Sequence, residues 1–533
     1  MQSVREECLG DALDGAAARW GNAIGWVFDD AQVSFAAMRE RADEIARALL
    51  REGVEAGDVV AVWMPNLPEF SAVQFACAKI GAITTAINTR FRSFEVEHML
   101  RQSDAKIVIM VERFLKHDYL DVLTQIGALP CSPDGSVDNA FYPSLRRLVS
   151  LEERPDPRLM SWAAFLAHGQ EVAPERVRER QAQRHWREPT LIQYTSGTTA
   201  APKGALIDHR YVLNAGDAVF GSMGVKAGEA ILNTQPFYHI GGSCAGSPAP
   251  LAIGCKVVTP SFYEAERVLQ LIERERCVAR SGFAAMYIME MGHPRFRDYD
   301  LSSMRAAWCT GPNSLLERIR DAYGIEGVTR LYSSTEVGNT IGRHDEPWSV
   351  RVETYGRPVP GTEIEIRDPG TRRTLPVGET GEIAMRSWWQ MIGYHKQPDE
   401  TAKVIDAEGW MHTGDRGFLQ ADGCLHFLGR FKDMMKVGGE NVSAEEVEVL
   451  LLAHPKIQQA AVIGMPDDRL DEVPMAFVEL KAGETMTADE LIAYCRPIMA
   501  NFRVPRRVEF LTEWPMTGSG KIQKHVLRQR IGA

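Results

Sequence analysis

The sequence predicts an α/β fold in which a large N-terminal domain of stacked β–α–β sheets carries a β-rich subdomain and is followed by a small α+β C-terminal domain. Three observations lead to this prediction. The chain has 533 residues, too many for one ordinary hydrophobic core. Segments typical of strands and of helices alternate over most of its length. This alternation gives way to short strands with Pro and Gly turns near residue 356, and the pattern changes again beyond residue 429.

The first alternation predicts a parallel sheet near the N-terminus. Its strands are expected at 59–64, 82–87 and 106–111, and its helices at 69–80 and 93–101. Parallel strands need a crossover connection, and a helix of this length supplies one. Residues 128–158 are richer in Pro, Asp and Ser, and we interpret them as an irregular surface excursion.

A second alternation predicts a further sheet subdomain. Its strands are expected at 256–259, 305–309 and 328–332. Helix starts are expected where a Ser precedes a Glu by three residues, because the two side chains can form a capping box. These pairs are Ser261 with Glu264 and Ser314 with Glu317.

The last 100 or so residues read as a separate α+β module, large enough to fold alone. Strands are expected at 460–463 and 476–480, and helices behind the capping pairs Ser443 with Glu446 and Thr487 with Glu490. We therefore predict domains at 1–428 and 434–533, with the boundary at 429–433.

Composition excludes several classes of protein. A formal net charge of −11 argues against an electrostatic nucleic-acid binder. The nine cysteines show no metal-ligand or disulfide spacing, which is typical of a reducing compartment. No apolar run reaches the roughly 18 residues of a membrane span, and no secretory signal is evident. We expect a cytoplasmic enzyme.

The segment from Tyr194 to Gly204 predicts a phosphate-binding loop between two strands. Hydroxyl side chains, glycines and Lys203 occur together in it. Glycine allows close approach of backbone N–H groups to a ligand, hydroxyls donate hydrogen bonds, and one lysine adds a point charge. The spacing is not that of a Walker loop. Taken alone, the segment is also compatible with a plain polar turn.

Three further segments carry reactive groups. Tyr332 to Glu336 combines an aromatic ring, hydroxyls and a carboxylate, which suits a nucleotide base with a metal, although Ser-Ser-Thr-Glu alone is more typical of a helix N-cap. Asp415 follows Gly414 and could accept from two ribose hydroxyls, or could cap a turn. Lys521 ends a Gly- and Ser-rich arm that could deliver a positive charge.

Together these segments resemble the signatures of the adenylate-forming superfamily, in particular its acyl-CoA synthetase branch, and the resemblance extends along most of the chain. The sequence departs from the family at Ser333 and Ala200, where the family has glycine. The resemblance implies a mobile C-terminal domain that swings about a hinge at Lys432. It also implies an ATP site formed by Thr195, Ser196, Gly197, Thr198, Thr199, Lys203, Thr310, Gly311, Pro312, Tyr332, Asp415 and Arg430.

The same resemblance implies the remaining roles. Glu336 holds Mg²⁺ together with Thr198, and Thr335 touches the α-phosphate and the acyl carboxylate. Lys521 is the catalytic lysine, and His239 lies beside the acyl site. Coenzyme A passes Gly438 and Gly439, and the acyl pocket is bordered by Gly241, Gly242 and Gly338.

The predicted function is an ATP-dependent acyl-CoA ligase that converts a carboxylate and ATP into acyl adenylate and pyrophosphate and then forms the thioester. The small residues after His239 favour a medium-to-long or bulky ring-bearing acid, unless those glycines serve only turns and packing. The alternatives are a luciferase-like oxidase, a carrier-protein acyl adenylase and a non-enzymatic nucleotide sensor. The acid and the oligomeric state stay open, a homodimer being one option.

Overall fold

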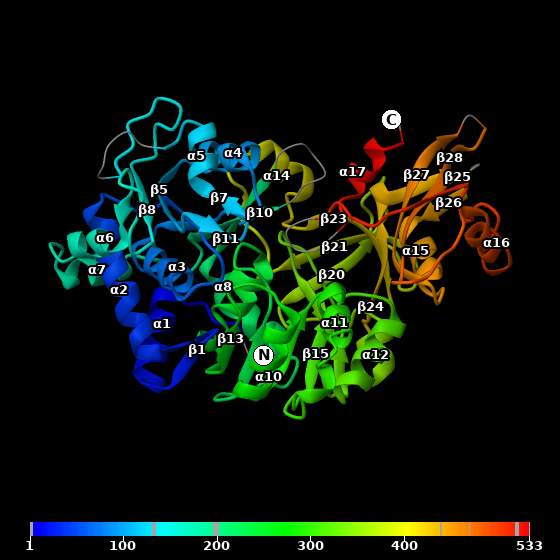
Figure 1. The fold of residues 1–533 in the computed structure, drawn as a ribbon, viewed down its shortest axis with the longest axis horizontal. Coiled ribbons are helices and arrows are strands. Elements are labelled where there is room, and N and C mark those ends of the chain that lie inside the picture. The colour runs from blue at the N-terminus through cyan, green and yellow to red at the C-terminus, as the bar shows by residue number, and fades with distance from the viewer. Residues whose placement is uncertain are drawn as a thin grey trace.

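The computed structural model describes residues 4–129, 135–195, 202–437, 440–467, 469–516 and 522–531. Two large sheets with their helices form the N-terminal body, a β-rich region follows, and the C-terminal sheet lies at the far end of the long axis (Figure 1). The predicted fold class is confirmed, because parallel β–α–β sheets, a β-rich part and a small α+β part occur in that order.

One sheet of the N-terminal body has eight strands. In spatial order they are β22 (Gly393–Tyr394), β11 (Lys203–Asp208), β10 (Pro189–Thr195), β4 (Ile83–Ala86), β3 (Val59–Trp63), β5 (Ala105–Met110), β8 (Arg147–Ser150) and β9 (Met160–Ser161). The strands from β10 to β9 run parallel, whereas β11 and β22 are antiparallel to their neighbours. The phosphate loop therefore connects the last parallel strand of this sheet, β10, to its first antiparallel strand, β11.

The other large sheet has seven strands. In spatial order they are β16 (Gly327–Thr329), β15 (Ala306–Cys309), β14 (Cys277–Gly282), β12 (Ala230–Asn233), β13 (Lys256–Thr259), β1 (Ile24–Phe28) and β2 (Ala31–Ser34). All neighbours are parallel except β2, which is antiparallel to β1.

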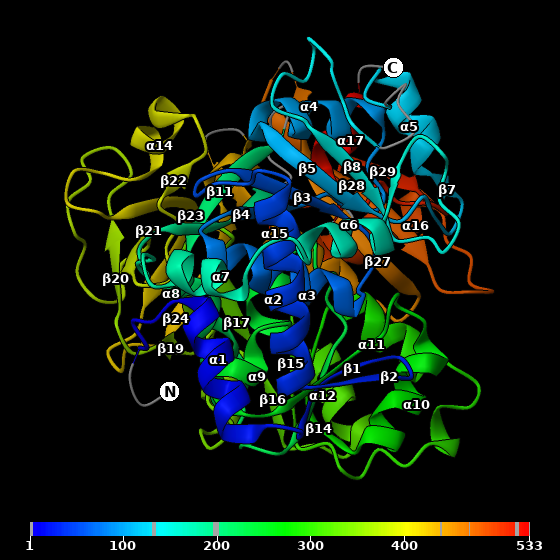
Figure 2. The ribbon, with the colours of Figure 1, turned by 90° about the vertical axis from the view of Figure 1, so that its left-hand side faces the viewer.

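Helix α3 (Pro68–Ile80) lies in the core and contacts both sheets. Every residue from Phe70 to Ile80 is buried, as expected for a helix that is packed on all sides. It packs against β4 of one sheet, and the ring of Phe75 lies 5.9 Å from the ring of Trp26 in β1 of the other. Figure 2 shows α3 beside α2 (Phe35–Arg51), with β1 and β2 below them and β3 and β5 above.

The helices on and around these sheets differ widely in length, from the 5 residues of α9 to the 17 of α2. Besides α2 and α3, they are α1 (Leu9–Trp20), α4 (Ser93–Ser103), α5 (Tyr119–Gln125), α6 (Trp162–Gly169), α7 (Pro174–Gln181), α8 (His209–Gly216), α9 (Ala249–Ile253), α10 (Ala265–Glu275), α11 (Ala284–Met291), α12 (Asn313–Tyr323) and α13 (Trp348–Glu353). None of the helices in the described part of the chain combines the length and the apolar character that a membrane crossing needs.

Strand β8 corrects the interpretation of residues 128–158 as an irregular excursion. It pairs in parallel with β5 and extends the eight-stranded sheet, and its Leu148 and Val149 are fully buried. It has only two consecutive apolar residues between Arg147 and Ser150, so it shows no buried run, and its partner lies about 40 residues earlier in the chain.

The β-rich region begins where the predicted strand 328–332 divides in two. Residues up to Thr329 close the seven-stranded sheet as β16, and β17 (Leu331–Ser333) starts a three-stranded sheet with β18 (Asn339–Ile341) and β19 (Arg357–Pro358). A four-stranded sheet follows, formed by β20 (Thr362–Arg367), β21 (Gly381–Ser387), β23 (Met411–Leu419) and β24 (Leu425–Arg430). Helix α14 (Pro398–Val404) packs beside them.

Within the described residues, the C-terminal part has a five-stranded sheet and three α-helices. Its strands are β26 (Glu440–Ser443), β25 (Met434–Val437), β28 (Asp471–Leu480), β27 (Ile457–Asp467) and β29 (Arg507–Phe510), and its helices are α15 (Ala444–Leu452), α16 (Ala488–Ile498) and α17 (Lys524–Gln529). Both predicted strands are confirmed, and they form a long antiparallel hairpin.

Of the predicted capping boxes, only the one at Thr487 and Glu490 is confirmed. Helix α10 begins at Ala265 and α12 at Asn313, so neither pair predicted there forms a cap. Ser443 does occupy the N-cap position of α15, but its hydroxyl donates instead to the carbonyl of Leu428, 3.2 Å away.

Candidate active site

The loop predicted to bind phosphate connects β10 and β11, as the sequence predicts. Thr195 and Lys203 face each other at the open end of this antiparallel pair, so the two described ends of the loop are held side by side. Ser196, Gly197, Thr198 and Thr199 lie outside the described residues. The strand pair therefore fixes where the loop departs and returns, and Lys203 is the first described charge at its return.

Lys203 contacts two side chains that the sequence motifs do not include. Its Nζ lies 2.5 Å from Oε2 of Glu400 and 5.1 Å from the centre of the Tyr394 ring. The Tyr394 hydroxyl in turn donates to Oε1 of Glu336 at 3.1 Å. Hydrogen bonds from Lys203 and then from Lys403 lower the pKa of Glu400 to about 2. The structure thus links the phosphate loop to the second motif through Tyr394.

The segment from Tyr332 to Glu336 leads from the end of β17 into a tight turn and does not start a helix. The hydroxyl of Ser334 accepts hydrogen bonds from the backbone N–H groups of Glu336 (3.2 Å) and Val337 (3.1 Å). The chain then continues into β18, so the alternative interpretation of this segment as a helix N-cap is wrong. The carbonyl of Thr335 accepts from the hydroxyl of Tyr211 at 3.2 Å, which anchors the turn to α8.

Tyr332, Asp415 and Arg430 come together from three strands. The Tyr332 hydroxyl donates to Oδ2 of Asp415 at 2.7 Å, and Nε of Arg430 lies 3.1 Å from Oδ1 of the same carboxylate. Asp415 and Arg430 are also cross-strand partners in β23 and β24. Gly414 has a φ of 70°, a conformation that favours glycine, and it turns the strand just before Asp415.

Thr310, Gly311 and Pro312 connect β15 to α12 beside this group. The carbonyl of Gly311 accepts a hydrogen bond from the guanidinium of Arg330, which precedes β17. Pro312 is the residue before the helix, where its fixed φ is tolerated. Thr310 reaches the cavity described next.

A cavity of about 140 Å³ lies between the Thr335 turn and the segment around His239. Large aromatic side chains dominate its wall: Phe220, Phe283, Trp308 and Trp389. The ring of His239 lies 6.0 Å from that of Phe283 in an edge-to-face arrangement. His239 is followed by a π-helical turn at Gly241–Gly246, an irregularity that is frequent at functional sites.

The three glycines predicted to border the acyl pocket have different surroundings. Gly241 lines the cavity. At Gly242 a Cβ would stand 2.2 Å from the carbonyl oxygen of Pro236, so this glycine is required by a close backbone contact. At Gly338, where φ is 60°, a Cβ would stand 2.2 Å from Cε of Met385. Gly242 and Gly338 do not line this cavity, and close packing explains why each is a glycine. Their place beside the acyl group stays a prediction.

The residues predicted to act from the C-terminal side are only partly described. Gly438, Gly439 and Lys521 lie outside the described residues. The backbone of Lys432 lies in a single 3₁₀ turn, Phe431–Asp433, directly after β24. Asp433 is paired with Arg528 of α17 at 2.8 Å, which ties this turn to the C-terminal helix.

The described carboxylates suit magnesium bound together with a nucleotide. No group of three His, Cys, Asp or Glu side chains gathers as a metal site within the described ranges. Glu336 offers one carboxylate, already oriented by Tyr394, near the strands of the phosphate loop. Mg²⁺ usually takes one or two protein carboxylates and completes its shell with phosphate oxygens and water. The donor set therefore fits Mg²⁺ carried by ATP.

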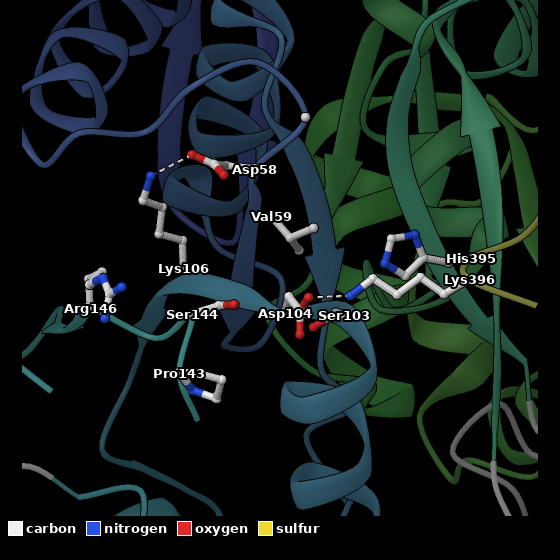
Figure 3. A pocket seen from close by; sticks show the side chains of 11 residues that line it. Asp58, Val59, Ser103, Asp104, Lys106, Pro143, Ser144, Arg146, His395 and Lys396 are labelled. Atoms are coloured by element: carbon white, nitrogen blue, oxygen red, sulfur yellow. Dashed lines mark hydrogen bonds and ion pairs between the residues drawn. The ribbon is translucent and has the colours of Figure 1, made fainter. Parts of the chain in front are cut away.

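A larger hollow of about 350 Å³ lies at the amino-terminal ends of β3 and β5 in the eight-stranded sheet (Figure 3). It is lined by polar side chains, including Lys106, Lys396 and His395, and none of the predicted site residues lines it. Lys106 is paired with Asp58 at 2.7 Å, and Lys396 is paired with Asp104. Because both lysines already have carboxylate partners, the hollow is not assigned to the candidate active site.

Comparison with known proteins identifies the family. Residues 13–395 match the AMP-binding enzyme family, and residues 446–521 match the C-terminal domain of AMP-binding enzymes. The chain belongs to the AMP-binding enzyme family. The prediction of an adenylate-forming enzyme of the acyl-CoA synthetase branch, an AMP-forming acid–thiol ligase, is confirmed.

Relatives match this family member over nearly its whole length. The Bacillus subtilis protein YngI, whose name assigns it provisionally to the acyl-CoA synthetases, is 32% identical over 538 residues, which cover 99% of this chain and 98% of YngI. The mitochondrial medium-chain acyl-CoA ligase ACSF2 of Danio rerio is 31% identical over 541 residues, covering 99% and 88%. The crystal structure of the anthranilate CoA ligase AuaEII with anthranoyl-AMP has a TM-score of 0.85 at 25% identity, covering 99% and 97%.

Proposed function

We propose that this AMP-binding enzyme is an ATP-dependent acyl-CoA ligase working in two steps. In the first, a carboxylate oxygen attacks the α-phosphorus of ATP, the bond to the leaving oxygen breaks, and acyl adenylate and pyrophosphate form. In the second, the thiol of coenzyme A attacks the acyl carbon and displaces AMP, so that a thioester forms. Dividing the reaction in this way replaces one difficult step by two easier ones.

The observation that carries the proposal is the convergence of the Tyr332–Asp415–Arg430 group, Glu336 and the aromatic cavity around one short turn. In this proposal Asp415, which is 4% exposed, accepts from the ribose hydroxyls. Tyr332 lies against the adenine, and Lys203 reaches the phosphates. The fixed donors and charges act where negative charge develops, which is the largest usual contribution to catalysis.

The remaining roles follow the same arrangement. Thr335 and His239 both line the cavity, and in this proposal Thr335 contacts the acyl carboxylate while His239 lies beside the acyl group. Glu336, with Thr198, holds Mg²⁺, which when bound neutralises charge on the phosphates. Lys521 stabilises the departing pyrophosphate, and Gly438 with Gly439 borders the path of coenzyme A. We keep residues 1–428 and 434–533 as the proposed domains and 429–433 as the hinge.

The acyl group is proposed to be an extended or ring-bearing carboxylate. The medium-chain acyl-CoA ligase among the relatives supports an acid with an extended acyl chain. The anthranoyl adenylate bound to the anthranilate CoA ligase supports an acid with an aromatic ring. No Asp or Glu occurs among the described residues of the cavity wall, so a substrate ammonium has no counter-ion there. This argues against amino-acid adenylation. A cytoplasmic location stays a prediction.

Pyrophosphate release from Mg·ATP, measured over straight-chain and aromatic acids with and without coenzyme A, tests the proposal. We expect acid-dependent release, and acyl-CoA equal in amount to AMP only when coenzyme A is present. Release without any thioester would replace the ligase by another adenylating activity, and light emission in oxygen would indicate an oxidase. ATP binding without pyrophosphate release for any acid would indicate a nucleotide sensor.

A further inference from the structure

Gln235 has a buried side-chain amide without a hydrogen-bonding partner. The residue is 1% exposed, and among the described residues neither its Oε1 nor its Nε2 has a partner. Its backbone is nevertheless firmly held, because the carbonyl accepts from the side-chain amides of Asn66 (3.2 Å) and Asn233 (3.1 Å). Buried amides are almost always satisfied in native proteins, so this one requires an explanation.

The amide of Gln235 borders the aromatic cavity beside Gly241. Both residues line it, and a Cβ built on Gly241 would stand 2.5 Å from Oε1 of Gln235. The glycine therefore leaves the space that the amide occupies. Ser281, another polar residue of the wall, already donates to Asn233 at 3.2 Å. Gln235 thus brings an NH2 group that can donate and a carbonyl oxygen that can accept to the same wall as the aromatic side chains.

The size and the walls of the cavity select the kind of group that fits. An apolar cavity of about 150 Å³ is known to take benzene, and this one measures about 140 Å³. Aromatic walls also favour offset or edge-to-face contacts with a ring. None of the described lining residues is Asp, Glu, Lys or Arg, so a second charge on the ligand has no partner.

We propose that Gln235 selects ring-bearing carboxylic acids that carry a neutral hydrogen-bonding substituent, such as a hydroxyl or amino group, on the ring. The proposal rests on the function proposed above, because it takes this cavity as the acyl site. A hydroxyl can donate to Oε1 or accept from Nε2, and an amino group can donate to Oε1, so either substituent gives the unpaired amide a partner. An unsubstituted ring leaves the amide unsatisfied, and such mismatches are the strongest source of discrimination between similar substrates.

Matched pairs of acids test this selectivity. Pyrophosphate release is measured with benzoate, its hydroxy and amino positional isomers, isophthalate as the doubly charged analogue, and octanoate. We expect at least one hydroxy- or aminobenzoate to exceed benzoate in kcat/KM by roughly 10- to 100-fold, and isophthalate and octanoate to react poorly. Benzoate or octanoate matching the best substituted acid would overturn the proposal while leaving the ligase function intact.

The variant Gln235→Met removes the amide and keeps the approximate size of the side chain. We expect the preference for the substituted acid to fall to near unity, chiefly through KM, with the KM for ATP unchanged. The control Ala245→Val changes the volume of the same wall without changing its polarity, and it should affect both acids of a pair alike. An unchanged ratio in Gln235→Met would contradict the proposal.

Thermal melting and direct binding separate a specificity role from a structural one. Because Gln235→Met removes an unsatisfied buried group, its melting temperature should equal or exceed that of the wild type. A lower melting temperature of Gln235→Met, together with an equal loss of kcat/KM for all acids, would show that the amide serves the structure and not the selection of the acid. Calorimetric binding of each acid pair to the wild type and to Gln235→Met needs no turnover. This measurement therefore tests the role of Gln235 in selecting the acid even if no acid supports pyrophosphate release and the proposed ligase function is refuted.

Discussion

The ion pair with Glu400 positions the side chain of Lys203 but binds it only weakly. Its ion pair with Glu400 is partly open to solvent, with the two side chains 24% and 32% exposed. Pairs of this kind contribute only about 0–1 kcal/mol. A triphosphate offers several anionic oxygens, so it can draw the lysine away at little cost. Glu400 thus holds Nζ of Lys203 near Tyr394.

Replacing Glu336 by Gln should weaken the productive use of Mg·ATP. The amide oxygen can still accept from Tyr394, so the turn and the melting temperature should be preserved. The negative charge that a hard cation prefers is lost, and we expect a rate loss of roughly 10- to 100-fold, equal to about 1.4–2.8 kcal/mol. Pyrophosphate release is measured while Mg²⁺ is titrated at fixed ATP.

The matched control for Glu336 is Glu400→Gln, which also removes a carboxylate near Lys203. It should leave the Mg²⁺ dependence unchanged. If Glu336→Gln titrates with Mg²⁺ as the wild type does and at the same rate, Glu336 serves only the turn.

Lys521→Ala should impair the first half-reaction alone. The charge of this lysine is needed while pyrophosphate departs, and loss of one such contact typically costs about 10²–10³ in rate. Pyrophosphate release measures the adenylation half-reaction. To measure thioester formation alone, chemically prepared acyl adenylate is supplied together with coenzyme A. The control is Lys456→Ala, which removes an exposed lysine of the C-terminal part. Equal losses in both half-reactions would contradict the role of Lys521.

At the residue scale, the sequence predicts the groups that occur in motifs and misses those that reach the site from elsewhere. Tyr332, Asp415 and Arg430 can be predicted because each lies in a recognisable segment, and the structure brings them together. Tyr394 and Glu400 lie almost 200 residues after Lys203, on short elements without a distinctive pattern. Only the pairing of β22 with β11 brings them close, and a single sequence carries no signal of that pairing.

At the element scale, the strands and helices that can be predicted from the sequence are those whose burial leaves an apolar pattern in it. Long parallel strands and their crossover helices show continuous apolar runs or a helical period, and their bounds agree with the prediction to within a few residues. The short strand β8 shows neither pattern. At Ser443 the predicted capping motif fails because the hydroxyl donates to the carbonyl of Leu428 instead of accepting from the helix backbone.

Helix α15 carries a carboxylate whose protonation should affect stability. Burial, assisted by the nearby Glu448, raises the pKa of Glu445 from 4.5 to about 7, against the opposing effect of Lys524 and Arg330. The folded protein therefore binds this proton more tightly than the unfolded chain. The resulting stabilisation is complete below about pH 4.5 and is lost as the pH rises through 7.

Glu445→Gln should remove this pH dependence because the amide stays neutral. Relative to the wild type, the variant should gain melting temperature at pH 8 and show little difference at pH 4.5. The measurement is thermal melting of both proteins at intervals between these pH values. Glu513→Gln, which changes an exposed carboxyl, is the control and should give a difference that does not vary in this window. A constant difference for Glu445→Gln would show that its carboxyl is not perturbed.

At the scale of the whole molecule, the C-terminal sheet lies beside the end of the four-stranded sheet (Figure 1). Polar contacts join the C-terminal part to β23 and β24. Arg416 lies 3.9 Å from Glu446, and the two side chains are 25% and 34% exposed. The hydroxyl of Ser443 donates to the carbonyl of Leu428. Contacts of this kind are weak, and interfaces within a chain commonly allow relative domain motion. The arrangement supports a C-terminal domain that changes position between the two half-reactions.

The turn Phe431–Asp433 is where such a movement would concentrate, because it follows directly after the last strand of the β-rich region. A hinge works by changing φ and ψ at a few residues. Proline fixes φ near −65° and also restricts the residue before it. Lys432→Pro should therefore hold the chain in one arrangement, whereas Lys432→Ala removes the side chain and leaves the backbone free.

We expect Lys432→Pro to retain acid-dependent pyrophosphate release while its formation of acyl-CoA falls by about tenfold or more, equal to about 1.4 kcal/mol. Acyl adenylate should then accumulate on the enzyme, which single-turnover quenching with mass detection can measure directly. Lys432→Ala should form acyl-CoA at the wild-type rate. Equal impairment of both half-reactions in Lys432→Pro would point to general destabilisation, which melting would reveal. Unchanged turnover of coenzyme A in Lys432→Pro would show that the C-terminal domain does not move about this residue.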